Sequence, residues 1–447
     1  MVNPAAKRAL RTRLVTRSLR HNLALGVFLA LPCGIANATP ALTVLITFNG
    51  TDGAGPTSGL IADPAGGFYG ATGFGGTLTE CEGNGCGTVF ELTPPPAGGQ
   101  AWTETVLFAF DDTDGAVPTG LVAGADGNLY GAANDIAVGA PGFGTVFKLT
   151  PPSRRQTAWV ETPLFTFNPA GGRTPIGGLV TDAAGALFGT TSDGGKSDHG
   201  TVFELKPLGK HQTSWKEKIL TSFQNFKHGS DPLGTLIFDK AGDLYGTTAA
   251  GGTNGDGAVF ELTPPAAGSN AWKLRVLTSF NGIDGEEPWG SLLADAAGNL
   301  YGTTNEGGTF GDGTVFKLEV PAPGHTAWTK KVLFSFNGTG GESPYAGLIA
   351  DAAGNLYGTT YYGGASSACK GGCGTVFELS PPAYDRTAWT ETVLASFDGT
   401  NGAGPHGSLI ADAAGNLYGT TSTGGATTSC DCGTVFELTG TGFALMP

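Results

Sequence analysis

Residues 344–360 run Pro344-Tyr-Ala-Gly-Leu-Ile-Ala-Asp351-Ala-Ala-Gly-Asn-Leu-Tyr357-Gly-Thr-Thr360, and after a Gly-Gly loop the chain continues with Gly374-Thr-Val-Phe-Glu-Leu379 and Trp389-Thr-Glu-Thr-Val-Leu-Ala-Ser-Phe397. The same unit occurs seven times along the 447 residues, with neighbouring copies 56 to 62 residues apart. A period of this size indicates a solenoid, a propeller or another repeat architecture. The copies open at Pro56, Pro118, Pro175, Pro232, Pro288, Pro344 and Pro405.

Each copy predicts four short strands rich in β-forming residues. In the sixth copy they span residues 347–351, 355–360, 375–379 and 389–397. The first two are joined by Asp351-Ala-Ala-Gly-Asn, in which the Asp can accept backbone hydrogen bonds and the Gly can take a positive φ. We therefore expect a tight hairpin there in every copy that keeps this turn.

Four antiparallel strands repeated at this period form one blade of a β-propeller. We expect an all-β fold, a seven-bladed β-propeller of four-stranded antiparallel blades. Residues 43–48 match a fourth strand, whereas the last copy ends after its third strand at Leu438. The N-terminal strand should therefore pair with the C-terminal blade and close the ring. The rival architecture is a parallel β-helix, whose coils are usually much shorter than this unit.

Two recurring residue types carry packing information. Gly358 and its equivalents lie inside the second strand, which predicts a bulge or a close approach between strands. A Trp opens the fourth strand in six copies and a Phe lies in the third strand of all seven, as Trp389 and Phe377 do in the sixth. A large ring required in every copy is most simply explained by packing between blades.

Residues 1–38 form a different kind of segment. They contain six basic residues, an apolar run at 23–31 that is short for a membrane span, and a small-residue cleavage site at Ala36-Asn37-Ala38. We interpret them as an export signal peptide that carries Cys33 away with it, which leaves 39–447 as a single propeller domain. The chain is expected to be a periplasmic, cell-surface or secreted bacterial protein that does not span the membrane.

Removal of this leader changes the charge. It holds six of the 24 basic residues and none of the 38 acidic ones, which leaves 18 basic against 38 acidic residues, a net charge of about −20. Such a surface repels phosphate backbones and anionic lipid. Nucleic acid is therefore excluded as an expected partner.

The six remaining cysteines occur in pairs in the three longest loops between the second and third strands. In an exported protein this pattern predicts local disulfides. For Cys430 and Cys432 the ring would be tight, so pairing to another loop is the alternative. A metal site is disfavoured because the spacing is not that of zinc ligands and no His accompanies the cysteines. The pairs are Cys81 with Cys86, Cys369 with Cys373, and Cys430 with Cys432.

The residue after the opening proline differs between copies and should lie near the channel mouth, where the innermost strand begins. Amphipathic rings at such a place suit stacking on sugars or gripping an extended peptide, with nearby carboxylates as acceptors. The plainer interpretation is that the rings only cover a loop-rich rim. The candidate ligand-binding residues are Trp289, Tyr345 and His406, the loop residues Tyr361 and Tyr362, and the acceptors Glu286, Glu287 and Glu342.

No catalytic set emerges from the motifs. The histidines after residue 38 occupy unrelated places in their copies, and no Ser or Cys lies in a known nucleophile motif. The recurring aspartates, such as Asp351, belong to the hairpin turns. Residues 111–115 and 255–257 faintly resemble calcium loops but lack the full ligand series. We therefore expect no cofactor, with calcium as the one alternative.

The repeated motif Asn-Leu-Tyr-Gly-Thr-Thr, then Gly-Gly, then Gly-Thr-Val-Phe-Glu-Leu-Thr-Pro closely resembles that of the bacterial choice-of-anchor tandem repeat GloVer proteins, over residues 43–439. The resemblance implies an exported, propeller-like protein and supplies no catalytic residues. The second copy departs most, with Gly124 in place of the turn Asp and residues 132–135 in place of Thr-Thr and the Gly-Gly loop.

Three functions follow, in order of preference. The first is a non-catalytic extracytoplasmic binding scaffold, for carbohydrate or protein, that uses the face carrying the variable loops of copies five to seven. The second is an enzyme, a hydrolase or lyase, acting on extracellular polysaccharide. The third is a structural repeat protein of the cell envelope. We expect a monomer in each case.

Overall fold

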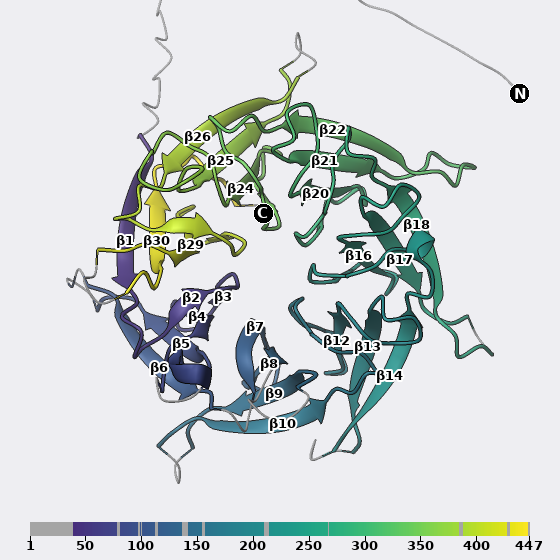
Figure 1. Ribbon diagram of the computed structural model, residues 1–447, viewed down its shortest axis with the longest axis horizontal. Coiled ribbons are helices and arrows are strands. Elements are labelled where there is room, and N and C mark those ends of the chain that lie inside the picture. Colours follow the sequence, from purple (N-terminus) through teal and green to yellow (C-terminus); the bar gives the residue numbers. More distant parts are fainter. Residues whose placement is uncertain are drawn as a thin grey trace, which may run out of the picture. The chain divides into compact units, whose positions relative to one another are not determined.

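The computed structural model describes residues 39–445 except 78–80, 97–98, 100, 112–114, 136–141, 154–156, 210–213, 267, 384–387 and 427–429. Seven small antiparallel sheets stand in a ring, each with its first strand toward the centre and its last at the periphery (Figure 1). The fold is the predicted all-β, seven-bladed β-propeller. The predicted signal peptide, residues 1–38, lies outside the described residues, so that division of the chain stays a prediction.

The first four blades follow one another along the chain, and in blade 1 the innermost strand is split in two. Blade 1 contains β2 (Ala54–Pro56), β3 (Ile61–Ala62), β4 (Phe68–Phe74), β5 (Thr88–Thr93) and β6 (Thr103–Ala109), with the 3-10 turn η1 (Cys81–Gly83). Blade 2 contains β7 (Ala116–Ala123), β8 (Leu129–Asp135), β9 (Thr145–Thr150) and β10 (Val160–Thr166). Blade 3 contains β11 (Val180–Thr181), β12 (Leu187–Thr191), β13 (Thr201–Pro207) and β14 (Trp215–Ser222), followed by η2 (Phe226–His228). Blade 4 contains β15 (Ile237–Phe238), β16 (Leu244–Thr248), β17 (Ala258–Thr263) and β18 (Lys273–Ser279).

The last three blades include the one built from both ends of the described chain. Blade 5 contains β19 (Leu293–Ala294), β20 (Leu300–Thr304), β21 (Thr314–Glu319) and β22 (Thr329–Ser335). Blade 6 contains β23 (Ile349–Ala350), β24 (Leu356–Thr360), β25 (Thr375–Ser380) and β26 (Thr390–Ser396). Blade 7 contains β27 (Ala403–Pro405), β28 (Ile410–Ala411), β29 (Leu417–Thr423), β30 (Thr434–Thr439) and the N-terminal β1 (Ala41–Thr47).

The N-terminal strand closes the ring as predicted. β1 pairs antiparallel with β30, with Ala41 opposite Thr439 and Thr47 opposite Thr434. The register shift between Val44 and Ile46 has a counterpart in the other blades, where the third and fourth strands are also offset once. β1 is therefore a regular fourth strand of blade 7. Beyond it, the Phe48 N–H donates to the Gly433 carbonyl at 3.1 Å.

One aromatic contact recurs at all seven blade interfaces. The Phe that follows the fourth strand packs edge to face on the third-strand Phe of the next blade, with centroids 5.0 to 5.3 Å apart and planes at 64° to 69°. All of these rings are at most 2% exposed. The pairs are Phe48–Phe90, Phe110–Phe147, Phe167–Phe203, Phe223–Phe260, Phe280–Phe316, Phe336–Phe377 and Phe397–Phe436.

The glycine inside each second strand makes room for this contact. A Cβ on Gly358 would lie 2.7 Å from the ring of Phe377, its cross-strand partner, and 3.0 Å from Leu348. The ladder between β24 and β25 is regular at this point, so the predicted bulge or strand approach is wrong. What approaches Gly358 closely is the ring of Phe377, and any residue larger than glycine at this place in the second strand would displace that ring.

The tryptophans also join blades, as expected. Each of five packs on a second-strand aromatic of the preceding blade, with centroids 5.9 to 6.4 Å apart. β1 brings no Trp to blade 7. At that interface Phe443 contacts Tyr357 of blade 6 at 5.0 Å, and the neighbouring Ala444 carbonyl accepts from the Ala352 N–H at 2.8 Å. The C-terminal segment thus fills the position that a Trp fills elsewhere.

The recurring aspartates have the structural role that was predicted. Asp351 Oδ1 accepts the backbone N–H groups of Ala353 and Asn355 at 2.9 Å each, and its Oδ2 accepts from the Tyr357 hydroxyl at 3.2 Å. Asp182, Asp239, Asp295 and Asp412 make the same backbone contacts. The three cysteine pairs form disulfides within their own loops, Cys430–Cys432 included. No helix in the described part of the chain is long and apolar enough to cross a bilayer.

A buried threonine pair links the second and third strands in five blades, with hydroxyls 2.8 to 2.9 Å apart. In blade 4 Ala258 occupies the position of the second threonine, and the buried Thr248 hydroxyl has no partner among the described residues. The pairs are Thr72–Thr88, Thr191–Thr201, Thr304–Thr314, Thr360–Thr375 and Thr421–Thr434.

Ala258→Thr should therefore raise the free energy of unfolding by about 1 kcal/mol, because it pairs a buried hydroxyl that now lacks a partner. Equilibrium urea unfolding of the purified variant measures the change. Thr434→Ala, which breaks the equivalent pair in blade 7, should lower stability by a similar amount. A loss of stability in Ala258→Thr would contradict this account.

Three glutamates near the start of the fourth strand are also enclosed. Burial raises the pKa of Glu104, Glu217 and Glu391 to about 7, with Asp52 adding to the effect at Glu104. In each, Oε1 is buried without a hydrogen-bond partner among the described residues. Because the folded state holds these protons more tightly, its stability should fall as the pH rises from about 4.5 to about 7.

The triple variant Glu104→Gln, Glu217→Gln and Glu391→Gln keeps a neutral side chain at each place and should remove this fall. Unfolding free energies of the two proteins should agree near pH 5 and diverge by pH 8 in favour of the variant, at up to about 1.4 kcal/mol per pH unit for each group. Parallel curves across this range would show that the three carboxyl groups titrate normally.

Candidate functional site

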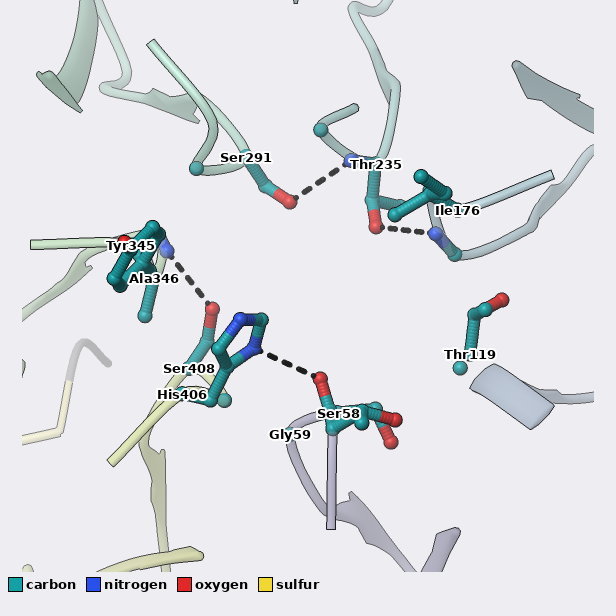
Figure 2. Close-up of a pocket in the computed structure, with 18 of the residues that line it drawn as sticks. Ser58, Gly59, Thr119, Ile176, Thr235, Ser291, Tyr345, Ala346, His406 and Ser408 are labelled. Atoms are coloured by element: carbon teal, nitrogen blue, oxygen red, sulfur yellow. Dashed lines mark hydrogen bonds between the residues drawn. The ribbon is translucent and has the colours of Figure 1, made fainter. Parts of the chain in front are cut away.

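A central cavity of about 440 Å³ opens where the innermost strands meet. Its lining includes the residue after the opening proline of all seven blades, which places the variable positions at the channel as expected (Figure 2). Blades 1 and 2 contribute threonines, blades 3 and 4 aliphatic chains, and blades 5 to 7 aromatic rings. The seven residues are Thr57, Thr119, Ile176, Leu233, Trp289, Tyr345 and His406.

The channel wall is built from backbone and small side chains. The Gly178 N–H donates to the Thr235 hydroxyl at 3.0 Å, the Thr235 N–H to Ser291 at 3.2 Å, and the Gly347 N–H to Ser408 at 3.1 Å (Figure 2). These bonds run between innermost segments of neighbouring blades. They explain why β23 has only two residues where a five-residue strand was predicted, since the preceding residues bond sideways and not within their own sheet.

Sequence analysis did not single out this belt of hydroxyl groups. The available signal was the third residue after the proline, which is Gly, Thr or Ser in six copies and is Leu121 in the second copy. Small residues suit it because a Cβ on Gly347 would lie 2.9 Å from the Ser291 carbonyl of the preceding blade. The belt holds the residues above it at a defined spacing.

Five of the predicted site residues form one continuous aromatic wall, defined here as Trp289, Tyr345, His406, Tyr361 and Tyr362. Tyr345 lies at its centre, 4.8 Å from Trp289, 5.1 Å from Tyr361 and 5.3 Å from His406 between ring centroids. Tyr345 and His406 are stacked, with 17° between their planes, and Tyr361 meets Tyr362 at 4.7 Å. The structure thus joins rings from the channel and from the enlarged loop of blade 6.

His406 is held by the seam between blades 7 and 1. Its Nδ1 donates to the Thr57 carbonyl at 3.1 Å (Figure 2). Burial lowers the pKa of His406, and this hydrogen bond opposes the change. The ring is therefore neutral near pH 7, with its proton on Nδ1 and Nε2 left as an acceptor.

Two polar groups of the wall have no hydrogen-bond partner among the described residues. The Trp289 indole N–H is buried and has no hydrogen-bond partner among the described residues. The Tyr345 hydroxyl likewise makes no hydrogen bond among the described residues. Its pKa is raised, mainly by burial and then by the nearby Tyr362, Tyr361, Glu287 and Glu306. Both side chains are half-buried and line the cavity.

The predicted carboxylates separate into two groups. Glu287 lies beside Trp289, and the two line a rim hollow of about 370 Å³ together with Asp193 and Asp231. Its Oε2 accepts from the Asn305 side-chain amide at 3.2 Å. This side chain is therefore placed where an acceptor next to the aromatic wall was expected.

Glu286 and Glu342 lie in the bridges between loops, opposite Glu306 and Tyr362 respectively. Burial, followed by Asp256, Glu306 and Glu287, raises the pKa of Glu286, while burial and Asp312 raise that of Glu342. Neither residue lines the central cavity or the rim hollow. The described residues that line the central cavity include no carboxylate.

A second rim hollow of about 360 Å³ lies beside the enlarged loop of blade 6. Tyr361, Tyr362 and Lys370 line it, and the Cys369–Cys373 disulfide crosses that loop. Tyr362 is 37% exposed, the most accessible ring of the wall's loop portion. The disulfide restrains the loop that presents these two tyrosines.

Metal ligation finds little support in the described residues, which contain no group of three or more His, Cys, Asp or Glu arranged to hold an ion. Of the two stretches that resemble calcium loops, residues 112–114 lie outside the described residues. Asp256, in the other stretch, lies near Glu286. The expectation about calcium stays open on these observations.

The family model of the Gloeobacter/Verrucomicrobia repeat matches residues 34–180, 138–327 and 272–445, and so extends over the whole ring. The chain belongs to this family. The match confirms the resemblance that the repeated motif of this Gloeobacter/Verrucomicrobia repeat protein indicated. Among curated proteins, none matches its sequence.

Several solved structures are similar to this repeat protein at low identity. A protein of unknown function from Dyadobacter fermentans is 12% identical, with a TM-score of 0.45 over 90% of this chain and 99% of that one. PorZ of Porphyromonas gingivalis, a surface component of the type-IX secretion system, is 12% identical, with a TM-score of 0.48 over 88% and 47%. The PQQ domain of pyranose dehydrogenase from Coprinopsis cinerea is 14% identical, with a TM-score of 0.43 over 89% and 95%. Likeness at this level concerns the fold alone.

Nitrogen NMR of the histidine side chains checks the state of His406. We expect its pKa to lie below the usual 6.5, with the proton on Nδ1 in the neutral form. The Thr57 carbonyl is the physical cause of that tautomer. A proton on Nε2 at pH 7, or a pKa at or above 6.5, would contradict the geometry of the seam.

Proposed function

We propose that the chain is an exported, non-catalytic binding scaffold that holds a carbohydrate at the channel mouth of blades 5 to 7. The observation that carries the proposal is the continuous aromatic wall beside a cavity of about 440 Å³. Pockets of this size with mostly apolar walls and a few placed polar groups are typical ligand sites.

The chemistry of the wall suits a sugar ring. The apolar faces of Trp289 and Tyr345 match the C–H face of a pyranose, while the phenol hydroxyl of Tyr345 lacks a partner among the described residues and suits its hydroxyl groups. Burying such a donor without a partner costs free energy that a ligand acceptor would recover. Neutral His406 adds an acceptor at Nε2.

The alternatives are ranked by the same geometry. An extended peptide could also pack on the rings and is the second ligand class. A glycoside hydrolase needs two carboxyl groups flanking one bond. Glu287 shares the rim hollow with Asp193 and Asp231, but the described residues that line the central cavity include no carboxylate, which favours binding over hydrolysis in that cavity. A purely structural repeat protein has no need of an open cavity lined by rings.

Glycan-array binding of the purified protein, followed by calorimetry on the best ligand, tests the proposal. Trp289→Ala with Tyr345→Ala should weaken binding by tenfold or more, because buried aromatic anchors carry much of the affinity of such sites. The matched control is Phe226→Ala with Phe310→Ala, which removes two aromatics that are 48% and 61% exposed and line none of the three hollows.

The control variant should bind like the wild type. Absence of any glycan binding, or equal binding by the Trp289→Ala, Tyr345→Ala variant, would overturn the proposal. Release of shortened or unsaturated products from the bound glycan would replace it with the enzyme alternative.

A further inference from the structure

The aromatic wall borders a group of acidic side chains, which lie beside the rim hollow and in the neighbouring loop bridge. Glu287 shares the rim hollow with Trp289. Glu306 is close enough to Tyr345 to help raise the pKa of its hydroxyl, although burial, Tyr362, Tyr361 and Glu287 contribute more. Glu286 lies opposite Glu306 in a loop bridge. Three carboxylates of blade 5 thus gather on one side of the wall.

These carboxylates have no cationic partner in the described part of the chain. The ion pairs found there involve other acids, of which Asp193 with Arg173 at 3.8 Å is the one that reaches the rim hollow. Asp231 also lines the hollow, and its pKa is raised, first by burial and then by the charges of Asp193 and Asp198. The hydrogen bond from Ser230 and the nearby His199 lower this pKa but do not cancel the rise. A ligand that brings positive charge would therefore relieve repulsion already present at the site.

We infer that the glycan held here carries protonated amines, as in a polymer of unacetylated amino sugars; this inference rests on the proposed carbohydrate function. The faces of Trp289 and Tyr345 attract a cation through the ring quadrupole. Glu287, placed beside Trp289 by its bond from Asn305, supplies the opposite charge. One ligand chemistry thus satisfies both the rings and the carboxylates.

The same charges discriminate against other glycans. A uronic acid or a phosphorylated sugar would add negative charge to a hollow already lined by carboxylates, in a protein whose net charge after loss of the leader is about −20. A neutral glycan would stack on the rings and could donate hydroxyl hydrogen bonds to Glu287, but it would lack the attraction between opposite charges. The expected order of affinity is therefore cationic, then neutral, then anionic.

A matched pair of ligands tests this order. Calorimetry at about pH 6 and low salt compares glucosamine tetramer with N-acetylglucosamine tetramer, which share a backbone and differ in the charge of the amine. The unacetylated tetramer should bind at least tenfold tighter, and the difference should shrink as salt is added.

Charge variants then locate the effect. Glu287→Gln with Glu306→Gln should remove most of the difference, because it weakens binding of the unacetylated tetramer much more than binding of the acetylated one. The control, Glu91→Gln with Asp243→Asn, removes two charges elsewhere on the ring and should retain the difference. Burial and the nearby Asp63 raise the pKa of Glu91, and burial, Asp239 and Glu261 raise that of Asp243. Replacing these two carboxylates therefore relieves repulsion, as it does at Glu287 and Glu306.

The outcomes separate this inference from the proposed function. Equal affinity for the two tetramers, or an unchanged difference in the Glu287→Gln, Glu306→Gln variant, overturns the inference and leaves glycan binding intact. Failure of both tetramers together with an empty glycan array overturns the proposed function itself. Lysine tetrapeptide that binds as tightly as the glucosamine tetramer, with the same loss in Trp289→Ala, would assign the site to a basic protein segment and overturn the inference.

Discussion

The propeller depends on one contact made seven times, the edge-to-face packing of a Phe after the fourth strand on the third-strand Phe of the next blade. Each blade offers the ring that its neighbour needs, and a second-strand glycine leaves the space for it. Such pairs favour one relative orientation of the two sheets. Because every interface uses the same pair, the turn from blade to blade is nearly constant, and seven such turns bring the last blade back to the first.

This regular frame allows the channel mouth to vary. Near the residue after the opening proline, hydrogen bonds join the innermost segments of neighbouring blades, as in the bond from the Gly347 N–H to the Ser408 hydroxyl. Six residue types occupy the seven equivalent places around one cavity. The aromatic wall arises where three successive blades place rings there and blade 6 adds two more from its loop.

The repeat made the fold predictable, and the limits of that prediction have a physical origin. Four strand segments per copy, the Asp turn and the pairing of β1 with β30 could be inferred from local patterns and from counting. The innermost strands came out shorter because Gly347 and its equivalents bond to other blades, which no pattern within one copy reveals. Burial of a ring against Gly358 was also hidden, since a missing side chain indicates close approach but not what approaches.

For the site, the sequence placed the variable residues at the channel but not their mutual contacts. Tyr345 contacts three rings, and its contact with Tyr361 depends on the path of the blade 6 loop. Glu287 lies beside Trp289 whereas Glu286 does not, which depends on the positive φ of Glu287. The C-terminal Phe443 was missed for a similar reason, because it replaces a residue type found in the other copies.

The way the two ends share blade 7 determines how the ring would respond to mechanical load. Ala41 faces Thr439 at one end of an antiparallel pair, so opposing pulls at these two points act across the strands and load one hydrogen bond at a time. Such a pair opens like a zipper, at lower force than strands that must slide past each other. A cell that tethered both ends would load this strand pair directly, whereas attachment at one end alone would leave the ring free of tension.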